Sequence, residues 1–339
     1  MSGITRRNLL RGAAATGLLA AGSGILASCQ RPLVASAAPA PRAAARLGFL
    51  ALTSAADYAP YTSAFRAGLH DLGYMEGRNI SIDERFAQGR EELLPGLAAD
   101  LVARGVDVLV TASTQAALAS TATTSTVPII FFNSGDPLGA GLVNNLARPG
   151  GNATGLTSLN RELAGKRLEL LKTAAPGITR VAALWADAAE RDVNETRSSA
   201  FWLGMQIETF RVGGPDDLES TLQKVTDSRA DALVAISSPL INSFREQITD
   251  YTSERRLASI SEVSEFAESG GLLAYGANLG DLARRAATYV DKILMGARPA
   301  DLPVERAARF ELAVNLRAAQ RLGLLLPTSL LLQATEVIA

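Results

Sequence analysis

The feature that most constrains the fold is a repeated alternation of short apolar runs with stretches of helical period. Residues 106–111 are mostly apolar and β-branched, as is typical of a strand buried in a parallel sheet. Residues 61–73 instead place Phe65 and Leu69 at helical spacing and end in a glycine. Because helices connect parallel strands, this alternation predicts an α/β fold whose parallel sheets are covered by helices.

The alternation runs twice along the chain, with a break in chain direction at residues 148–152. Before the break, strands are expected at residues 47–52, 80–86, 106–111 and 127–132, and helices at 61–73, 93–104, from about 115, and from Pro137 to 147. After it, strands are expected at 181–185, 206–212, 232–236, 259–263, 272–275 and 310–314, and helices at 163–173, 194–204, 216–227, 244–255, 282–294 and 316–322. Two similar α/β units in succession predict two lobes with a cleft between them.

The first 29 residues are expected to be an export signal rather than part of the fold. Arg6 and Arg7 precede the uncharged run 12–26, which is the order of a twin-arginine secretory signal. That run is shorter than the roughly 20 apolar residues that a spanning helix needs. A buried N-terminal helix is the alternative, and it does not explain the paired arginines.

Cys29 is the only cysteine of the chain, so it has no partner for an internal disulfide. The sequence Leu26-Ala27-Ser28-Cys29 resembles the lipobox of bacterial lipoproteins, in which the thiol is acylated. Residues 30–44, rich in Ala and Pro, would then form a flexible tether. Cleavage after Ala37 remains an alternative that would remove Cys29. Both alternatives predict a protein of the periplasm or cell envelope, and the first predicts a lipid anchor on the membrane.

Composition and missing motifs exclude several classes of protein. The net charge is −1 without a basic tract, which gives no support to nucleic-acid binding. Gly139-Ala140-Gly141 is followed by Asn144 where a dinucleotide fingerprint needs its third glycine. His70 is the only histidine, so neither a triad nor a metal cluster has histidine support beyond it. We therefore expect no catalytic residue, no metal and no cofactor.

Short segments in a fixed order give the chain a family resemblance. They include Phe65-Arg66-Ala67-Gly68-Leu69, Leu72-Gly73-Tyr74, Glu76-Gly77-Arg78-Asn79-Ile80, Gly135-Asp136-Pro137, Lys166-Arg167-Leu168-Glu169-Leu170-Leu171, Gly270-Gly271-Leu272, Tyr275-Gly276 and Phe310-Glu311-Leu312. Through these segments the chain resembles the ABC-importer substrate-binding proteins of the tryptophan/tyrosine-transport type. Members of that family are lipoproteins whose fold is like that of periplasmic binding proteins. The resemblance implies two Rossmann-like lobes of the type I periplasmic-binding-protein kind, with a ligand cleft between them.

The resemblance also implies where the lobes divide. The first lobe would comprise residues 45–155 with about 277–303, and the second 156–276 with about 304–339. The chain would cross between them near residues 152–158, 274–278 and 303–313.

Candidate ligand-binding residues follow from the topology. In open parallel sheets, ligands bind beyond the carboxyl ends of the strands, where helix N-termini offer unpaired N–H groups. The residues at those positions are Thr53, Ser54, Ser113, Thr114, Gln115, Ser134 and Asp136 in the first lobe, and Trp185, Ser237 and Glu262 in the second. They would form a polar shell with one aromatic side chain.

Several of these residues have a structural alternative. Ser113 and Thr114 are equally suited to cap the next helix or to hold a ligand carboxylate. Asp136 before Pro137 fits a helix N-cap, or an ion partner for a ligand ammonium. Trp185 fits the core as well as the cleft, and Glu262 fits either a solvated strand end or an ammonium partner.

The predicted function is the capture of a small solute by lobe closure and its delivery to an ABC permease and its ATPase. The family resemblance implies an aromatic or other amino acid. A lipoprotein that senses a solute and signals to a membrane receptor remains an alternative, since the sequence does not separate import from sensing. An α/β enzyme is a third, weaker alternative because its motifs are missing.

Overall fold

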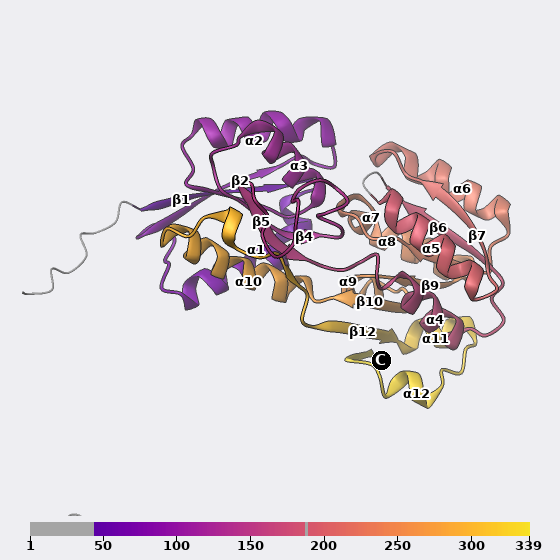
Figure 1. Cartoon of the computed structure of the whole chain (residues 1–339). Coiled ribbons are helices and arrows are strands. Elements are labelled where there is room, and N and C mark those ends of the chain that lie inside the picture. The colour runs from indigo at the N-terminus through magenta and orange to yellow at the C-terminus, as the bar shows by residue number, and fades with distance from the viewer. Residues whose placement is uncertain (1–43, 187–188) are drawn as a thin grey trace, which may run out of the picture. The chain divides into compact units, whose positions relative to one another are not determined.

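The computed structural model describes residues 44–186 and 189–339 (Figure 1). The expected export signal, Cys29 and nearly all of the expected tether lie outside these residues. Within the described part, the strands form two sheets. No described helix is both long enough and apolar enough to cross a bilayer.

The first sheet has the strand order β11-β5-β4-β3-β1-β2, and all its pairings are parallel. Its strands are β1 (Ala45–Ala51), β2 (Ile80–Phe86), β3 (Val108–Thr111), β4 (Ile129–Ser134), β5 (Ala153–Thr157) and β11 (Glu305–Arg306). The helices α1 (Ala55–Asp71) and α10 (Leu279–Leu294) cover one face, and α2 (Leu94–Ala103) and α3 (Thr114–Thr123) cover the other (Figure 1). The strands alternate accordingly: Phe49 packs toward α1, whereas Leu50 packs toward α2.

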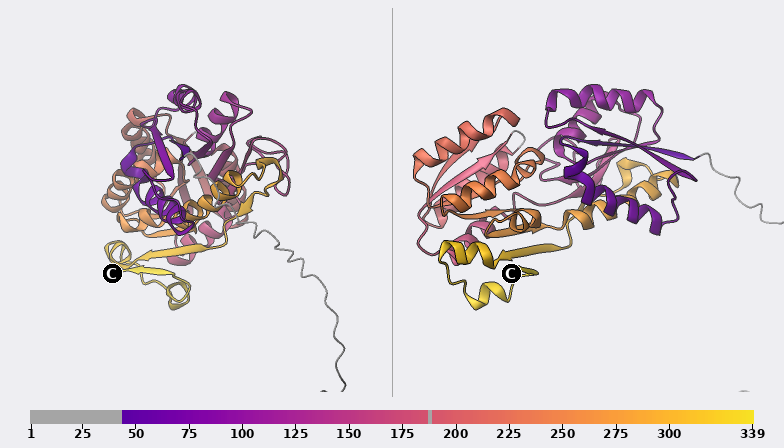
Figure 2. Two further views of the ribbon diagram at one scale, coloured as in Figure 1. Left: turned by 90° about the vertical axis from the view of Figure 1, so that its left-hand side faces the viewer. Right: turned by 180° about the vertical axis from the view of Figure 1, so that it is seen from behind.

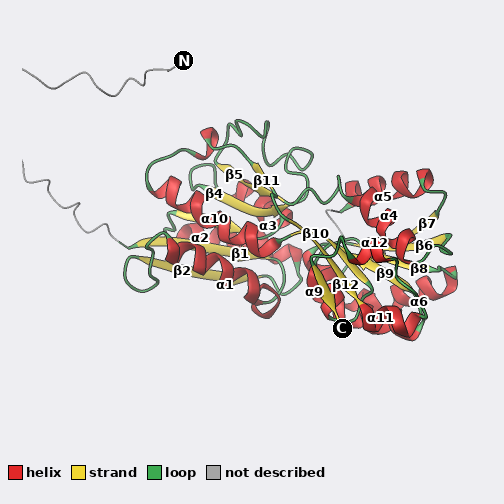
Figure 3. Cartoon of the chain, turned by 90° about the horizontal axis from the view of Figure 1, so that it is seen from below, coloured by secondary structure: helices red, strands yellow, loops and turns green. Residues whose placement is uncertain are grey.

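The second sheet has the order β13-β12-β10-β9-β8-β6-β7 and is parallel except for the antiparallel pair β10 and β12. Its strands are β6 (Arg180–Trp185), β7 (Gln206–Arg211), β8 (Ala232–Ala235), β9 (Ala258–Ser261), β10 (Leu273–Ala277), β12 (Phe310–Asn315) and β13 (Glu336–Ile338). Its helices are α4 (Ala164–Ala174), α5 (Glu190–Trp202), α6 (Leu218–Ser228), α7 (Pro239–Ser243), α8 (Arg245–Glu254), α9 (Ser264–Glu268), α11 (Leu316–Leu322) and α12 (Thr328–Leu331). The C-terminal segment, yellow in Figure 2, lies along the β12–β13 edge of this sheet. Helices flank the strands of both sheets in Figure 3.

The chain passes between the sheets at the ends of three strands. It leaves the first sheet after β5, returns after β10 through α10, and leaves again between β11 and β12. Gly155 in β5 has φ +153°, and a Cβ there would lie 1.8 Å from the Phe131 carbonyl oxygen. Only glycine therefore lets β4 and β5 lie this close at the start of the first crossing.

Two expectations about local structure are wrong. The sequence predicts a helix from Pro137 to residue 147, but the structure has turns there, in which Asp136 Oδ1 accepts the Gly139 N–H at 2.9 Å. Glycines disfavour a helix, and Gly141 adopts φ +74°. The sequence also assigns residues from about 304 to the second lobe, but β11 pairs with β5 in the first sheet.

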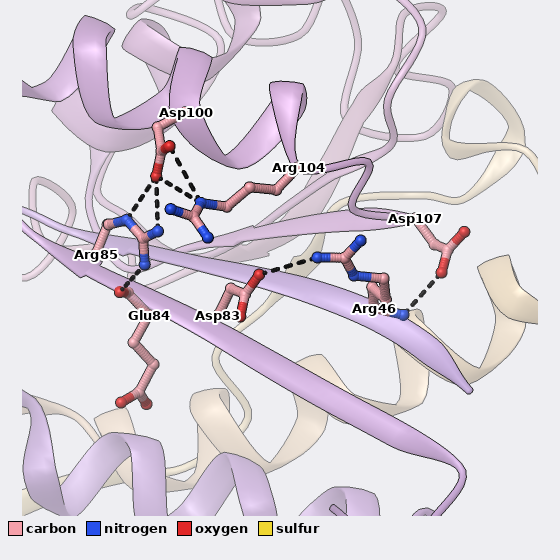
Figure 4. Close-up of polar contacts among 7 residues, drawn as sticks. All are labelled: Arg46, Asp83, Glu84, Arg85, Asp100, Arg104 and Asp107. Atoms are coloured by element: carbon pink, nitrogen blue, oxygen red, sulfur yellow. Dashed lines mark hydrogen bonds and ion pairs between the residues drawn. The ribbon is translucent and has the colours of Figure 1, made fainter. Parts of the chain in front are cut away.

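Charged side chains gather at the outer edge of the first sheet (Figure 4). Arg85 and Arg104 both donate to the carboxylate of Asp100, at 2.6–3.1 Å, and these hydrogen bonds lower the pKa of Asp100. Arg46 reaches Asp83 at 3.4 Å. These pairs are solvated, so we expect them to contribute little to stability.

Candidate functional site

A cavity of about 260 Å³ lies where the carboxyl ends of strands from both sheets meet. The first lobe contributes the loops after β3 and β4 with the start of α3, and the second contributes the start of α5 and the loop after β8. Its lining residues are Ser113, Thr114, Gln115, Leu118, Asn133, Gly135, Asp136, Ala140, Asn160, Ala189, Glu190, Arg191, Asp192, Ser237, Ser238 and Pro239. The lining is mostly polar and has no aromatic side chain among the residues that the structure describes.

The first-lobe wall is built around the N-terminus of α3. Ser113 caps this helix by accepting the Ala116 N–H at 3.1 Å, and Thr114 Oγ1 lies 3.1 Å from Ser134 Oγ. Ser134 is buried behind Thr114 and is not a lining residue. The wall therefore presents hydroxyl groups and the positive end of a helix dipole, a combination that suits an anionic group.

Asp136 stands between the two lobes and is held by arginines. Its Oδ2 lies 2.9 Å from Arg161 Nη1 and 3.3 Å from Arg191 Nη1, the latter on α5 of the second lobe. Gly139 leaves the space for this cluster, because a Cβ there would lie 1.8 Å from Arg191 Nη1 and 2.0 Å from Asp136 Oδ2. Asp136 is thus engaged in a contact between the lobes as well as in its turn.

The second-lobe wall carries Asp192 in the first turn of α5. The residue is only 8% exposed, and burial raises the pKa of its carboxyl to about 6, with Arg167 opposing that rise. The expectation that ligands bind in the loops after strands does not point to Asp192, because this residue lies inside the helix that follows β6 and not in the loop before it. Sequence reasoning missed it, together with Asn160 and Arg191.

Glu262 lies behind this wall rather than on it. Its Oε1 is 3.0 Å from Arg167 Nη2, and it is neither a solvated strand end nor a lining residue of the cavity. Burial raises the pKa of Glu262 to about 7, against the opposing effect of Arg167. Arg167 also donates to the carbonyl oxygens of Asn160 at 2.5 Å and Tyr275 at 3.5 Å.

A smaller hollow of about 70 Å³ adjoins the cavity, since Asn133 and Pro239 line both. Thr53 lines this hollow together with Tyr61 and Arg245. The Tyr61 hydroxyl donates to Glu265 Oε1 at 2.8 Å, which joins α1 of the first lobe to α9 of the second. Burial, with the nearby Glu265 carboxylate, raises the pKa of Tyr61 well above its usual value.

The other predicted site residues have structural partners or packing. Ser54 caps α1 in a reciprocal capping box with Asp57. Ser237 lines the cavity and exchanges a hydrogen bond with the Asn242 side chain. Trp185 packs on the core between the second sheet and α4 and α5, and it is not among the cavity's lining residues.

The structure thus brings Ser113, Thr114, Gln115, Asp136 and Ser237 together on the walls of one cavity, with Thr53 in the adjoining hollow. Within residues 44–186 and 189–339, no group of three or more His, Cys, Asp or Glu side chains is placed to hold a metal ion. Hydroxyls, amides, a helix N-terminus and carboxylates in this arrangement can bind a small molecule that carries both charges.

Known proteins resemble this chain over most of its length. The family model of ABC transporter substrate binding proteins matches residues 55–338. A tyrosine-binding protein from Clostridioides difficile is 25% identical over 254 residues, which are 74% of this chain and 73% of that protein.

Solved structures resemble it as well. The crystal structure of an ABC domain in complex with L-Trp from Streptococcus pneumonia superposes with a TM-score of 0.81 at 29% identity, covering 87% of this chain and 99% of that one. A periplasmic binding protein from Burkholderia mallei, with a TM-score of 0.57 at 15% identity, covers 76% of this chain and 80% of its own and shares the fold alone. The periplasmic-binding-protein-like α/β fold predicted from the sequence is confirmed.

Proposed function

Since the chain belongs to the family of ABC transporter substrate-binding proteins, we propose that it captures a small extracytoplasmic solute and delivers it to an ABC permease and its ATPase. The solute would occupy the cavity that residues of both lobes line. The partner ATPase would supply the energy for transport of the solute, and the protein itself would catalyse no reaction.

The proposed ligand is an amino acid, bound as a zwitterion. The observation that carries this proposal is the opposition of the two cavity walls. The N-terminus of α3 with Ser113 and Thr114 lies on one wall, and the buried carboxyl of Asp192 lies on the other. A helix N-terminus favours a carboxylate, and a carboxylate favours an ammonium. The relatives named above include one crystallised with L-Trp and one described as tyrosine-binding, so aromatic amino acids are the first candidates.

Closure of the lobes would retain the ligand, as in hinge motions of periplasmic binding proteins. Two contacts between the lobes support this proposal. Asp136 pairs with Arg191 at the cavity, and the Tyr61 hydroxyl donates to Glu265 at the adjoining hollow. The moving units would be residues 45–155 with about 277–303 and residues 156–276 with the C-terminal segment. Their hinges would be the crossings after β5, after β10 and between β11 and β12.

The leader fits this function. We propose export by the twin-arginine signal and acylation of Cys29, which would hold the protein beside its permease at the membrane. Mass spectrometry of the mature N-terminus tests this. A diacylglyceryl-modified Cys29 supports it, and a mature chain that begins after Ala37 contradicts it.

Isothermal titration calorimetry with the standard amino acids tests the ligand class. We expect saturable binding of at least one of them, with aromatic amino acids among the binders. If no amino acid binds while another solute does, the protein is a binding protein for a different class of solute. Co-purification or crosslinking with a permease tests the import role separately.

A further inference from the structure

Asp192 extends from the second lobe toward the first across the cavity. It occupies the first turn of α5. A Cβ built on Gly135, in the loop after β4, would lie 3.7 Å from Asp192 Oδ2 and 3.7 Å from Asn160 Cβ. The carboxylate therefore faces a space bounded by the first lobe and the first crossing segment, inside the cavity that Asp192 lines.

This carboxylate differs from the other buried or half-buried carboxylates near it. Asp136 is paired with Arg161 and Arg191, and Glu262 is paired with Arg167. Among residues 44–186 and 189–339, no hydrogen bond or ion pair reaches the side chain of Asp192. A buried carboxylate without a partner is unfavourable, so its position at a cavity wall suits a partner that a bound ligand supplies.

The nearby cations are directed elsewhere. Arg167 acts on Asp192 electrostatically, but its donors meet Glu262 and the carbonyl oxygens of Asn160 and Tyr275. Arg161 donates to Asp136. A compact cation inside the cavity would supply the missing donors, and a primary ammonium carries three N–H groups in a small volume.

We propose that Asp192, rather than Asp136 or Glu262, binds the ammonium group of the amino-acid ligand. The inference rests on the proposed function, because it assigns one group of the ligand that the proposed function requires. The assignment also fixes the orientation of the ligand in the cavity: the ligand carboxylate lies toward the N-terminus of α3, and the ligand ammonium lies toward α5.

The charges around Asp192 make this contact sensitive to pH. Burial raises the pKa of Asp192 to about 6, Asp136 and Glu162 add to the rise, and Arg167 and Arg161 oppose it. Asp192 in turn contributes to the raised pKa of Glu262. Glu190 and Arg191, its neighbours on α5, complete the charged groups that line this part of the cavity.

A ligand ammonium binds the ionised form of Asp192 and competes with its protonation. Affinity is therefore expected to be constant well above pH 6 and to fall below it. A free amino acid remains a zwitterion between pH 5 and pH 7, so the ligand itself contributes no such change.

The test measures binding of the twenty standard amino acids to the full chain and to D192N at pH 7.5. For every amino acid that the wild type binds, we expect D192N to bind about tenfold to a hundredfold more weakly, the usual effect of losing a hydrogen bond to a charged group. The matched control is E195Q, which removes an exposed carboxylate on the same helix and is expected to retain the affinity. Deaminated analogues, such as indole-3-propionate for L-Trp, should bind poorly to the wild type and lose little further in D192N.

Two further readouts separate ligand binding from a structural role. D192N without ligand is expected to melt no lower than the wild type, because it removes a buried charge that has no partner among the described residues. The wild-type affinity should fall roughly tenfold between pH 7 and pH 5, and that of D192N should stay constant. If the wild type binds amino acids and D192N binds them equally well, the assignment of Asp192 is wrong and the proposed function stands. If the wild type binds no amino acid, the proposed ligand class and this assignment both fall.

Discussion

Arg167 on α4 and Glu262 after β9 form an ion pair that is almost wholly enclosed, with Nη2 3.0 Å from Oε1 and side chains that are 3% and 2% exposed. The guanidinium also donates to carbonyl oxygens of the first crossing segment and of β10. The pair therefore joins α4, the end of β9 and a crossing segment directly behind the cavity. Its two members respond differently to the loss of the other, because a glutamate can take up a proton and an arginine cannot release one.

Replacing Arg167 with methionine is expected to destabilise the protein by about 3–5 kcal/mol at pH 8, where the abandoned Glu262 must either stay charged without a partner or take up a proton from an alkaline solution. The loss should be smaller at pH 5, where Glu262 is protonated and needs no cation. Urea unfolding at the two pH values measures both. The control is K166M on the same helix, since Lys166 meets Glu169 at 3.5 Å in solvent and its loss should change stability by less than about 1 kcal/mol. Equal losses for R167M at both pH values would contradict this account.

The raised pKa of Glu262 predicts how wild-type stability depends on pH. Its pKa rises from 4.5 to about 7 on folding, so the folded state binds the proton more tightly than the unfolded state. The resulting stabilisation is complete below pH 4.5 and is lost as the pH rises through about 7, by an amount on the order of 3 kcal/mol. In E262Q this part of the pH dependence is expected to disappear. Unfolding curves at pH 5 and pH 8 test it, and parallel pH profiles for E262Q and the wild type would show that Glu262 does not titrate in this range.

The sheets were predictable from the sequence because their strands are short apolar runs between helical stretches. The strand β2 and the helix α11 have the bounds that the sequence indicates. The segment after Pro137 was not predictable in the same way. Asp136-Pro137 is a good helix start, but Gly139 and Gly141 disfavour a helix and the segment forms turns. Gly139 is also needed because Arg191, from a distant part of the chain, fills the space that a larger side chain would take, and such a tertiary contact cannot be read from the local sequence.

The candidate site was predictable as far as the strand ends define it. Ser113, Thr114 and Gln115 follow β3 after one intervening residue, so sheet topology alone brings them to the cavity. Trp185 packs on the core with Val181 and Ala183, a placement that the period of two along β6 already indicates. Asp192 depends instead on the rotation of α5 about its axis and on the approach of the two lobes, neither of which the spacing of residues encodes.

The pair between Asp136 and Arg191 is expected to favour the closed form. In G139A, the new Cβ would overlap both side chains and displace them without changing a charge. Because the displaced atoms are ends of side chains, the fold should tolerate the change. Amino-acid affinity should fall by about twofold to fivefold, as expected for a solvated ion pair worth up to about 1 kcal/mol. Calorimetry measures this, with R197A on the outer side of α5 as control, and unchanged affinity in G139A would exclude a role of the pair in closure.

Gly276 in β10 is expected to be the glycine of the second crossing that tolerates substitution least. A Cβ at this position would lie 2.1 Å from the Glu262 carbonyl oxygen, and backbone cannot move aside as a side-chain end can. G276A should therefore separate β10 from the segment that carries Glu262 and destabilise the protein by about 1–3 kcal/mol or more. G96A is the control, because Gly96 lies in α2 with open space around it. Alanine at this position should raise the free energy of unfolding by about 0.5–1 kcal/mol. Thermal and urea unfolding of the two variants compares them, and a G276A protein as stable as the wild type would mean that β10 can shift away from Glu262 without loss.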